Sequence, residues 1–138
     1  MTNAVAAVAP KWMRWLGFVL SGLVILFMLM DATMKLMQLP IVLETTEQIG
    51  WPVASVVPLG IVLLLCTALY ALPQTSVLGA VLLTAYLGGA VATQARIGSP
   101  IVSHMLFGVY LGIMLWGGLY LRDDRVRALI LYRRPEAN

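Results

Sequence analysis

The chain has 138 residues, of which 61% are apolar and 11% are charged, and its mean hydropathy is +0.92. A soluble domain carries about 25% charged residues, because its surface faces water. The composition therefore predicts an integral membrane protein with the lipid bilayer as its partner, and it argues against nucleic-acid binding, phosphate handling and most hydrolytic chemistry.

Four segments are long and apolar enough to cross a bilayer core, which takes about 20 helical residues. No aspartate, glutamate, lysine or arginine occurs over 48–95 or over 97–121. The first of these runs is too long for one helix, and Pro73 with its polar neighbours breaks it into a helical hairpin. A connector over 38–51 precedes it, and a loop ending at Pro100 follows it. The expected spans are 15–37, 52–72, 75–94 and 101–121.

Helices are the expected spanning form, because backbone groups in lipid must be paired within the segment and the alternating pattern of a barrel strand is absent. The predicted fold class is all-α: an integral membrane four-helix bundle with its N- and C-termini on the same side. We expect one domain over 1–138, in which 122–138 form a basic tail.

Basic residues orient the bundle, because cytoplasmic loops carry an excess of lysine and arginine. The side that holds both termini has seven basic residues, and the other side has two. We therefore expect both termini in the cytoplasm and the protein in a bacterial inner membrane. The seven are Lys11, Arg14, Arg122, Arg125, Arg127, Arg133 and Arg134, and the two are Lys35 and Arg96.

Small residues at helical spacing indicate the faces through which membrane helices pack, because they permit close backbone approach. In the first span a stripe in steps of four and three residues begins at Gly17 and ends in the charges of Asp31 and Lys35. A G-x-x-x-G arrangement in the fourth span also suits a homo-oligomer. The expected packing residues are Gly17, Ser21, Ala85, Gly89, Gly108 and Gly112.

Polar side chains collect at the outer ends of the spans, opposite the termini, and the cytoplasmic half has no comparable cluster. Ionisable groups at membrane depth cost about 2.5 to 3.5 kcal/mol each, so they are usually paired or line a wet cavity. Asp31 has two candidate partners: Lys35, one helical turn away, and Arg96, across the helices. The cluster comprises Asp31, Lys35, Thr93, Gln94, Arg96, Ser103 and His104.

This cluster has two interpretations. In the first, it only holds the outer end of the bundle together. In the second, it forms the polar mouth of an apolar pocket for a small amphipathic or quinone-like molecule. His104 would then be the titrating group, because imidazole titrates near neutral pH.

The sequence indicates no catalytic residue and no metal site. His104 lacks a second histidine or cysteine at ligand spacing. The single cysteine, Cys66, excludes an internal disulfide, and its apolar surroundings favour a packing role. We expect no cofactor, apart from a quinone under the pocket interpretation.

Several segments resemble the DoxX-like family of small four-helix membrane proteins. They are YLGGAVAT from Tyr86, RIG from Arg96, HMLFGVYLG from His104 and WGGLYLRD from Trp116. The resemblance covers residues 14–131 and implies the same four-span fold. Related sequences often have glutamate at the position of Leu63 and histidine at that of Gln94, whereas Arg96 and His104 match the family pattern.

The resemblance also implies partners, because related DoxX and DoxD proteins are associated with sulfur and thiol redox assemblies, one of them a thiosulfate:quinone oxidoreductase. We therefore expect a non-catalytic membrane subunit or scaffold, with membrane or redox subunits as partners. The alternative is a protein that binds a small molecule, lipid or quinone in an outer pocket. An enzyme is less favoured, since no set of residues here supplies electron transfer unaided.

Overall fold

The computed structural model describes residues 10–129, and within them all regular structure is helical. Six α-helices are joined by short loops and by two short helical turns, η1 (Val53–Ser55) and η2 (Ile101–Met105). The predicted all-α class is confirmed. The helices are α1 (Lys11–Leu36), α2 (Pro40–Gln48), α3 (Val56–Ala71), α4 (Ser76–Arg96), α5 (Phe107–Arg122) and α6 (Asp124–Leu129).

Four helical segments are long and apolar enough to cross a membrane, and each overlaps one expected span. They cover Lys11–Leu36, Val53–Ala71, Ser76–Arg96 and Ile101–Arg122. The first and third extend beyond the expected bounds, because Lys11 and Arg96 can keep their charges at the membrane surface while their backbone continues the helix. Residues 130–138 of the predicted tail lie outside the described part.

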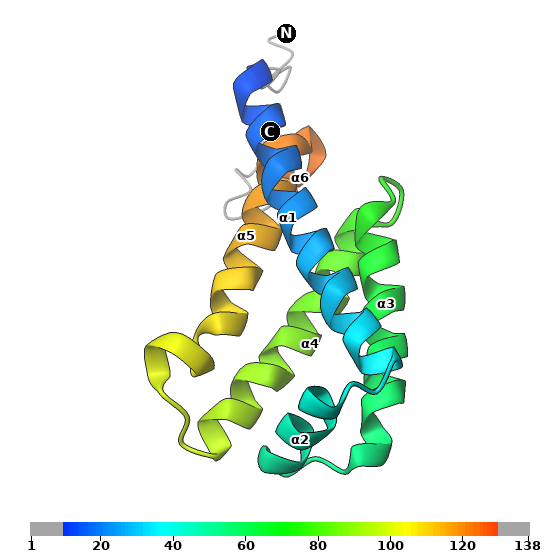
Figure 1. Cartoon of the computed structure of the whole chain (residues 1–138). Helices are drawn as coiled ribbons and strands as arrows, with labels where there is room; N and C mark the ends of the chain where they lie inside the picture. Colours follow the sequence, from blue (N-terminus) through cyan, green and yellow to red (C-terminus); the bar gives the residue numbers. More distant parts are fainter. Residues whose placement is uncertain (1–9, 130–138) are drawn as a thin grey trace, which may run out of the picture.

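The four long helices form a ring in which α1 contacts α3 and α5, and α4 contacts the same two helices. The start of α1 and the end of α5 meet at one end of the bundle, where Arg14 pairs with Asp124 at 3.3 Å. We call this the basic end. Figure 1 shows α2 lying across the opposite end, which we call the α2 end.

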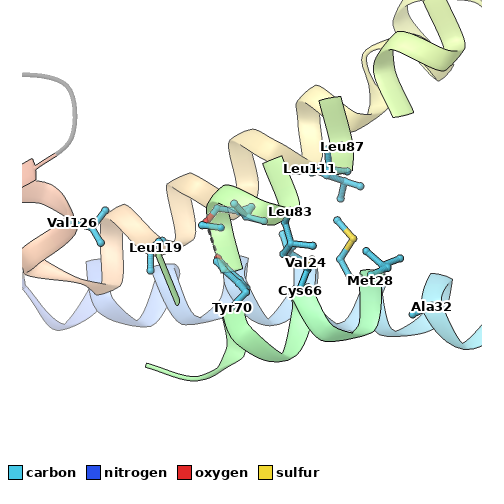
Figure 2. Close-up of a cluster of buried hydrophobic side chains, with 13 residues drawn as sticks. Val24, Met28, Ala32, Cys66, Tyr70, Leu83, Leu87, Leu111, Leu119 and Val126 are labelled. Atoms are coloured by element: carbon cyan, nitrogen blue, oxygen red, sulfur yellow. Dashed lines mark hydrogen bonds between the residues drawn. The ribbon is translucent and has the colours of Figure 1, made fainter. Parts of the chain in front are cut away.

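The core is a continuous column of apolar side chains contributed by all four long helices. Figure 2 shows Val24, Met28, Leu83 and Leu111 pointing into the space that the helices enclose. Large apolar side chains also cover the outside of the bundle, as expected for a surface that faces lipid. Apolar side chains thus lie both inside and outside the bundle, and packing between the helices decides which of them are buried.

Helices α1 and α5 approach each other closely near the basic end. A Cβ atom added at Gly17 would lie 2.8 Å from the backbone nitrogen of Arg122 and from the carbonyl oxygen of Gly118. Only a residue without a side chain permits this approach. Ser21, one turn further along, is buried in the same contact, as the α1 stripe predicts.

The other expected packing residues divide into two groups. Gly108 is buried, and a Cβ added there would lie 3.1 Å from the Leu87 carbonyl oxygen of α4. A Cβ added at Gly89 or Gly112 would meet no atom within 4 Å, and Ala85 is exposed. These three residues therefore do not lie in tight helix contacts within the described chain.

The connector expected between the first two spans contains a helix. Pro40 begins α2, a position where its missing N–H breaks no helical hydrogen bond. The helix ends before Gly50, whose φ of +85° suits glycine. Thr46 is its buried residue. The connector between the first two spans thus contains a helix, which covers the α2 end of the bundle.

Candidate ligand-binding cavity

A cavity of about 540 Å³ lies at the α2 end of the bundle. Its walls are formed by the second half of α1, one face of α2, the second half of α4, and η2 with the start of α5, and Leu59 of α3 also lines it. Its volume falls in the range of small-molecule sites, about 300 to 1,000 Å³. Figure 1 shows α2 lying across this end of the bundle.

The deep walls of the cavity are apolar. Phe27 of α1 and Phe107 of α5 both line it, with their ring centroids 5.3 Å apart. Leu87 and Leu111 form its floor, where it meets the buried core, and Figure 2 places their side chains next to each other. Such walls exclude water and suit an apolar ligand.

One side of the cavity carries an ion pair. Lys35 Nζ donates to Asp31 Oδ2 at 2.6 Å, one helical turn apart on α1. The Lys35 side chain is 17% exposed and that of Asp31 is 33% exposed. Gly60 of α3 lets the Lys35 stem approach closely, since a Cβ added there would lie 3.0 Å from Lys35 Cβ. The lysine is thereby held against the bundle with its ammonium group at the cavity.

Of the two pairings considered for Asp31, the structure has the one with Lys35. Arg96 instead donates from Nη2 to the carbonyl oxygen of Ile49 at 2.8 Å, beside Gly50. Arg96 therefore lies outside the cavity and ties the end of α4 to the end of α2. The alternative pairing across the helices is wrong.

The wall formed by α4 contributes hydroxyl and amide groups. Thr93 Oγ1 donates to the Gly89 carbonyl oxygen at 2.8 Å and accepts a 3.2 Å hydrogen bond from Trp51 Nε1. Gln94 Oε1 accepts a 2.5 Å hydrogen bond from Ser99 Oγ, in the loop after α4. These contacts fix two polar side chains at the rim of the cavity.

The segment before α5 contributes His104. It begins with a wide turn, in which the nitrogens of Met105 and Leu106 bond the carbonyl oxygens five residues earlier. Such wide turns are frequent at functional sites. His104 lines the cavity, and its Nδ1 lies 2.7 Å from Ser103 Oγ, while Ser103 itself is exposed and lines no wall.

The structure thus brings five of the seven residues of the predicted polar cluster to one cavity. Arg96 and Ser103 lie beside it. Sequence reasoning missed Tyr86, which lines the same wall two helical turns before Thr93, and this spacing would have indicated it. It also missed the cavity wall formed by α2. Ile41, Thr45 and Ile49 line this wall at intervals of four residues, a spacing typical of one helix face. The five are Asp31, Lys35, Thr93, Gln94 and His104.

A family model described as the DoxX-like family matches residues 19–118. The matched region includes all of α3 and α4, most of α1 and α5, and the residues that line the cavity. The chain belongs to the DoxX-like family. Neither the comparison with curated proteins nor that with solved structures gave a match.

The two positions at which this DoxX-like protein departs from the expected family residues lie in different surroundings. Leu63 is fully buried in the core between the helices. Gln94 lines the cavity. Leu63 therefore places an apolar group in an apolar core, and Gln94 places a neutral hydrogen-bonding group at the rim.

The basic end holds a second polar network that sequence reasoning missed. Arg122 Nε donates to Ser21 Oγ at 3.0 Å, and Ser21 lies 2.9 Å from the Tyr70 hydroxyl, which donates to the Leu115 carbonyl oxygen at 2.7 Å. The guanidinium also lies over the Tyr70 ring, 5.3 Å from its centroid. Ser21 and Tyr70 lie within the expected spans, and Arg122 lies just beyond the fourth. Because its polar groups contact one another, the network has a structural role.

Within residues 10–129, no three histidine, cysteine, aspartate or glutamate side chains come together as a metal site would require. Cys66 is buried in the core. The cavity offers hydrogen-bond donors, acceptors and one ion pair above apolar walls. These groups can orient a ligand that has a polar head and an apolar body.

Proposed function

We propose that this DoxX-like protein binds a small lipophilic molecule in the cavity at the α2 end. The observation that carries the proposal is the composition of the cavity: apolar walls at depth and convergent polar groups at the rim. Five residues grouped from sequence as one polar cluster line it, although they come from three separate segments. A cluster that only held the helix ends together would close the space between them.

A cavity-filling substitution tests this proposal. Ala90 lines the cavity, whereas Ala95, on the same helix, is exposed and lines no wall of it. The matched control for Ala90→Phe is Ala95→Phe. Native mass spectrometry in mild detergent should find a co-purified lipophile on the wild type and on this control. Ala90→Phe should lose it, because the ring occupies the space. Absence of bound mass from all three proteins, or its retention by Ala90→Phe, would refute the proposal.

A non-catalytic membrane subunit or scaffold, including one in a redox assembly, is the second candidate. The observation that favours it is an open helix face on α5 at Gly112, where an added Cβ would meet no atom within 4 Å. Small residues on an open face suit another membrane helix, from a partner subunit or a second copy. Co-purification that depends on this face, with an empty cavity, would favour this candidate.

We further propose that the protein lies in a bacterial inner membrane with its basic end in the cytoplasm. Arg14, Arg122 and Arg127 belong to the basic end, whereas Lys35 and Arg96 lie at the α2 end. The excess of arginine and lysine at one end supports this orientation. The cavity would then open toward the outer side of the membrane.

A further inference from the structure

We infer that the cavity selects a lipophile whose polar head is uncharged over anionic and cationic amphiphiles with the same chain. This inference rests on the proposed function and names the class of ligand. With His104 counted as neutral, Asp31 and Lys35 are the charged side chains among the residues that line the cavity, and they neutralise each other. The charge balance of the site is therefore complete before any ligand binds.

A charged head would have to disturb this pair. An anion that bonded Lys35 Nζ would compete with Asp31 Oδ2, which lies 2.6 Å from it, and would leave the carboxylate without its cation. A cation that bonded Asp31 would likewise leave the ammonium group of Lys35 without its anion. Both side chains are largely shielded from solvent, so an unpaired charge would be poorly solvated.

Other charged residues near the cavity do not change this balance. Arg96 is held outside it by the Ile49 carbonyl oxygen. Glu44 and Glu47 are on α2, but both are exposed and neither lines the cavity. Apart from the imidazole of His104, which is counted as neutral here, a charged ligand would thus find no second counter-ion on the walls that the structure describes.

A neutral head finds hydrogen-bonding groups that are free to receive it. Within residues 10–129, the hydroxyl of Tyr86, the amide nitrogen of Gln94 and Nε2 of His104 have no side-chain or backbone partner, although all three residues line the cavity. None of these atoms is sealed off in the protein interior. An amide, hydroxyl or carbonyl head can pair with them and leave the ion pair intact.

The apolar part of such a ligand has a defined place. Phe27 and Phe107 flank the cavity, and Leu87 and Leu111 close it at depth. An alkyl or ring system that displaces water from these walls stabilises the complex whatever its head group. The head group therefore decides between ligands with equal chains.

Three probes with the same tetradecyl chain test this selectivity: N-tetradecylacetamide, tetradecyl sulfate and tetradecyltrimethylammonium. The wild-type protein, in a neutral maltoside detergent, is given equal concentrations of the three, and native mass spectrometry measures the bound fractions. We expect the acetamide to bind at least about tenfold more tightly than either ion, since an unpaired charge at membrane depth is costly. Equal or tighter binding of an ion would overturn the inference.

Reciprocal variants test whether the ion pair sets this preference. Asp31→Asn leaves Lys35 without its anion, so the sulfate should gain at least about tenfold relative to the acetamide. Lys35→Gln should produce the same gain for the ammonium probe. The double variant should again prefer the acetamide. Asp124→Asn, which removes the anion of the Arg14 pair at the basic end, is the matched control and should behave as wild type.

The outcomes separate the two proposals. If no probe binds to the wild type, or if binding survives Ala90→Phe, the proposed function fails and the inference fails with it. If the probes bind in the cavity but the variants at Asp31 and Lys35 leave their ranking unchanged, the inference alone fails. If one of the two single variants does not fold, the other single variant and the double variant still test the inference, because a different ranking of the three probes is expected for each.

Discussion

The hydroxyl of Tyr70 in α3 donates a 2.7 Å hydrogen bond to the carbonyl oxygen of Leu115 in α5. These helices lie diagonally across the ring, since each contacts α1 and α4. Figure 2 shows this bond as a dashed line from Tyr70 through the middle of the bundle. Because the Tyr70 proton goes to Leu115, the proton of Ser21 goes to Tyr70, and Arg122 donates to Ser21. The hydrogen bonds of the network thus all run in one direction, from Arg122 toward Leu115, and they join three helices.

This network predicts the effect of Tyr70→Phe. The variant keeps the ring but removes the acceptor for Ser21 and the donor for Leu115, so we expect the free energy of unfolding to fall by about 1 to 2 kcal/mol. A denaturant titration in detergent micelles measures it. Tyr110→Phe is the control, because it removes an exposed hydrogen bond to Val102 and should cost less. Equal stability of Tyr70→Phe and wild type would contradict a stabilising role.

The close approach of α1 and α5 predicts opposite effects for two glycine substitutions. Gly17→Ala places a Cβ 2.8 Å from two backbone atoms of α5, so one helix must shift, and overpacking of this kind costs about 1 to 3 kcal/mol. Gly112→Ala meets open space and should be neutral or stabilising by up to about 1 kcal/mol, because alanine favours helix. Thermal unfolding of the two variants in one detergent compares them. Loss of stability in Gly112→Ala alone would refute this assignment of contacts.

The attachment of α2 predicts a local effect of Arg96→Gln. The bond from Arg96 to Ile49 and that from Trp51 to Thr93 tie the C-terminal end of α2 to α4. Loss of the hydrogen bond from Arg96 should raise the hydrogen-exchange rate of the α2 amides by about fivefold, which corresponds to the net contribution of one hydrogen bond. Arg125→Gln, at an exposed position of α6, should leave these amides unchanged. Unchanged exchange in both variants would show that Arg96 does not hold α2.

The proposed orientation predicts the side from which single cysteines react. Glu47 on α2 and Arg125 on α6 are both exposed and lie at opposite ends of the bundle. In a Cys66→Ala background, a membrane-impermeant maleimide should label Glu47→Cys in intact cells, but Arg125→Cys only after permeabilisation. The reverse pattern would invert the orientation. Thr46 is a poor reporter, because it is buried against the cavity.

Much of the architecture could be predicted from the sequence because the bilayer imposes simple rules. Charge-free runs of spanning length indicate helices, and the stripe from Gly17 through Ser21 to Asp31 indicates the buried face of α1, since helical periodicity is local. The connector was harder to predict. Pro40 is a favourable first residue of a helix, but nine residues are marginal for a helix without tertiary contacts.

The sequence by itself determined the solvent, the number of spans and the gathering of polar residues at one end, because each of these depends on composition and on periodicity along one helix. Only the tertiary structure decided that Asp31 pairs with Lys35 and that Arg96 holds α2. It also decided that the cluster surrounds a cavity and that Tyr70 spans the bundle. These features depend on the angles and distances between helices, which the spacing of residues along one helix does not encode.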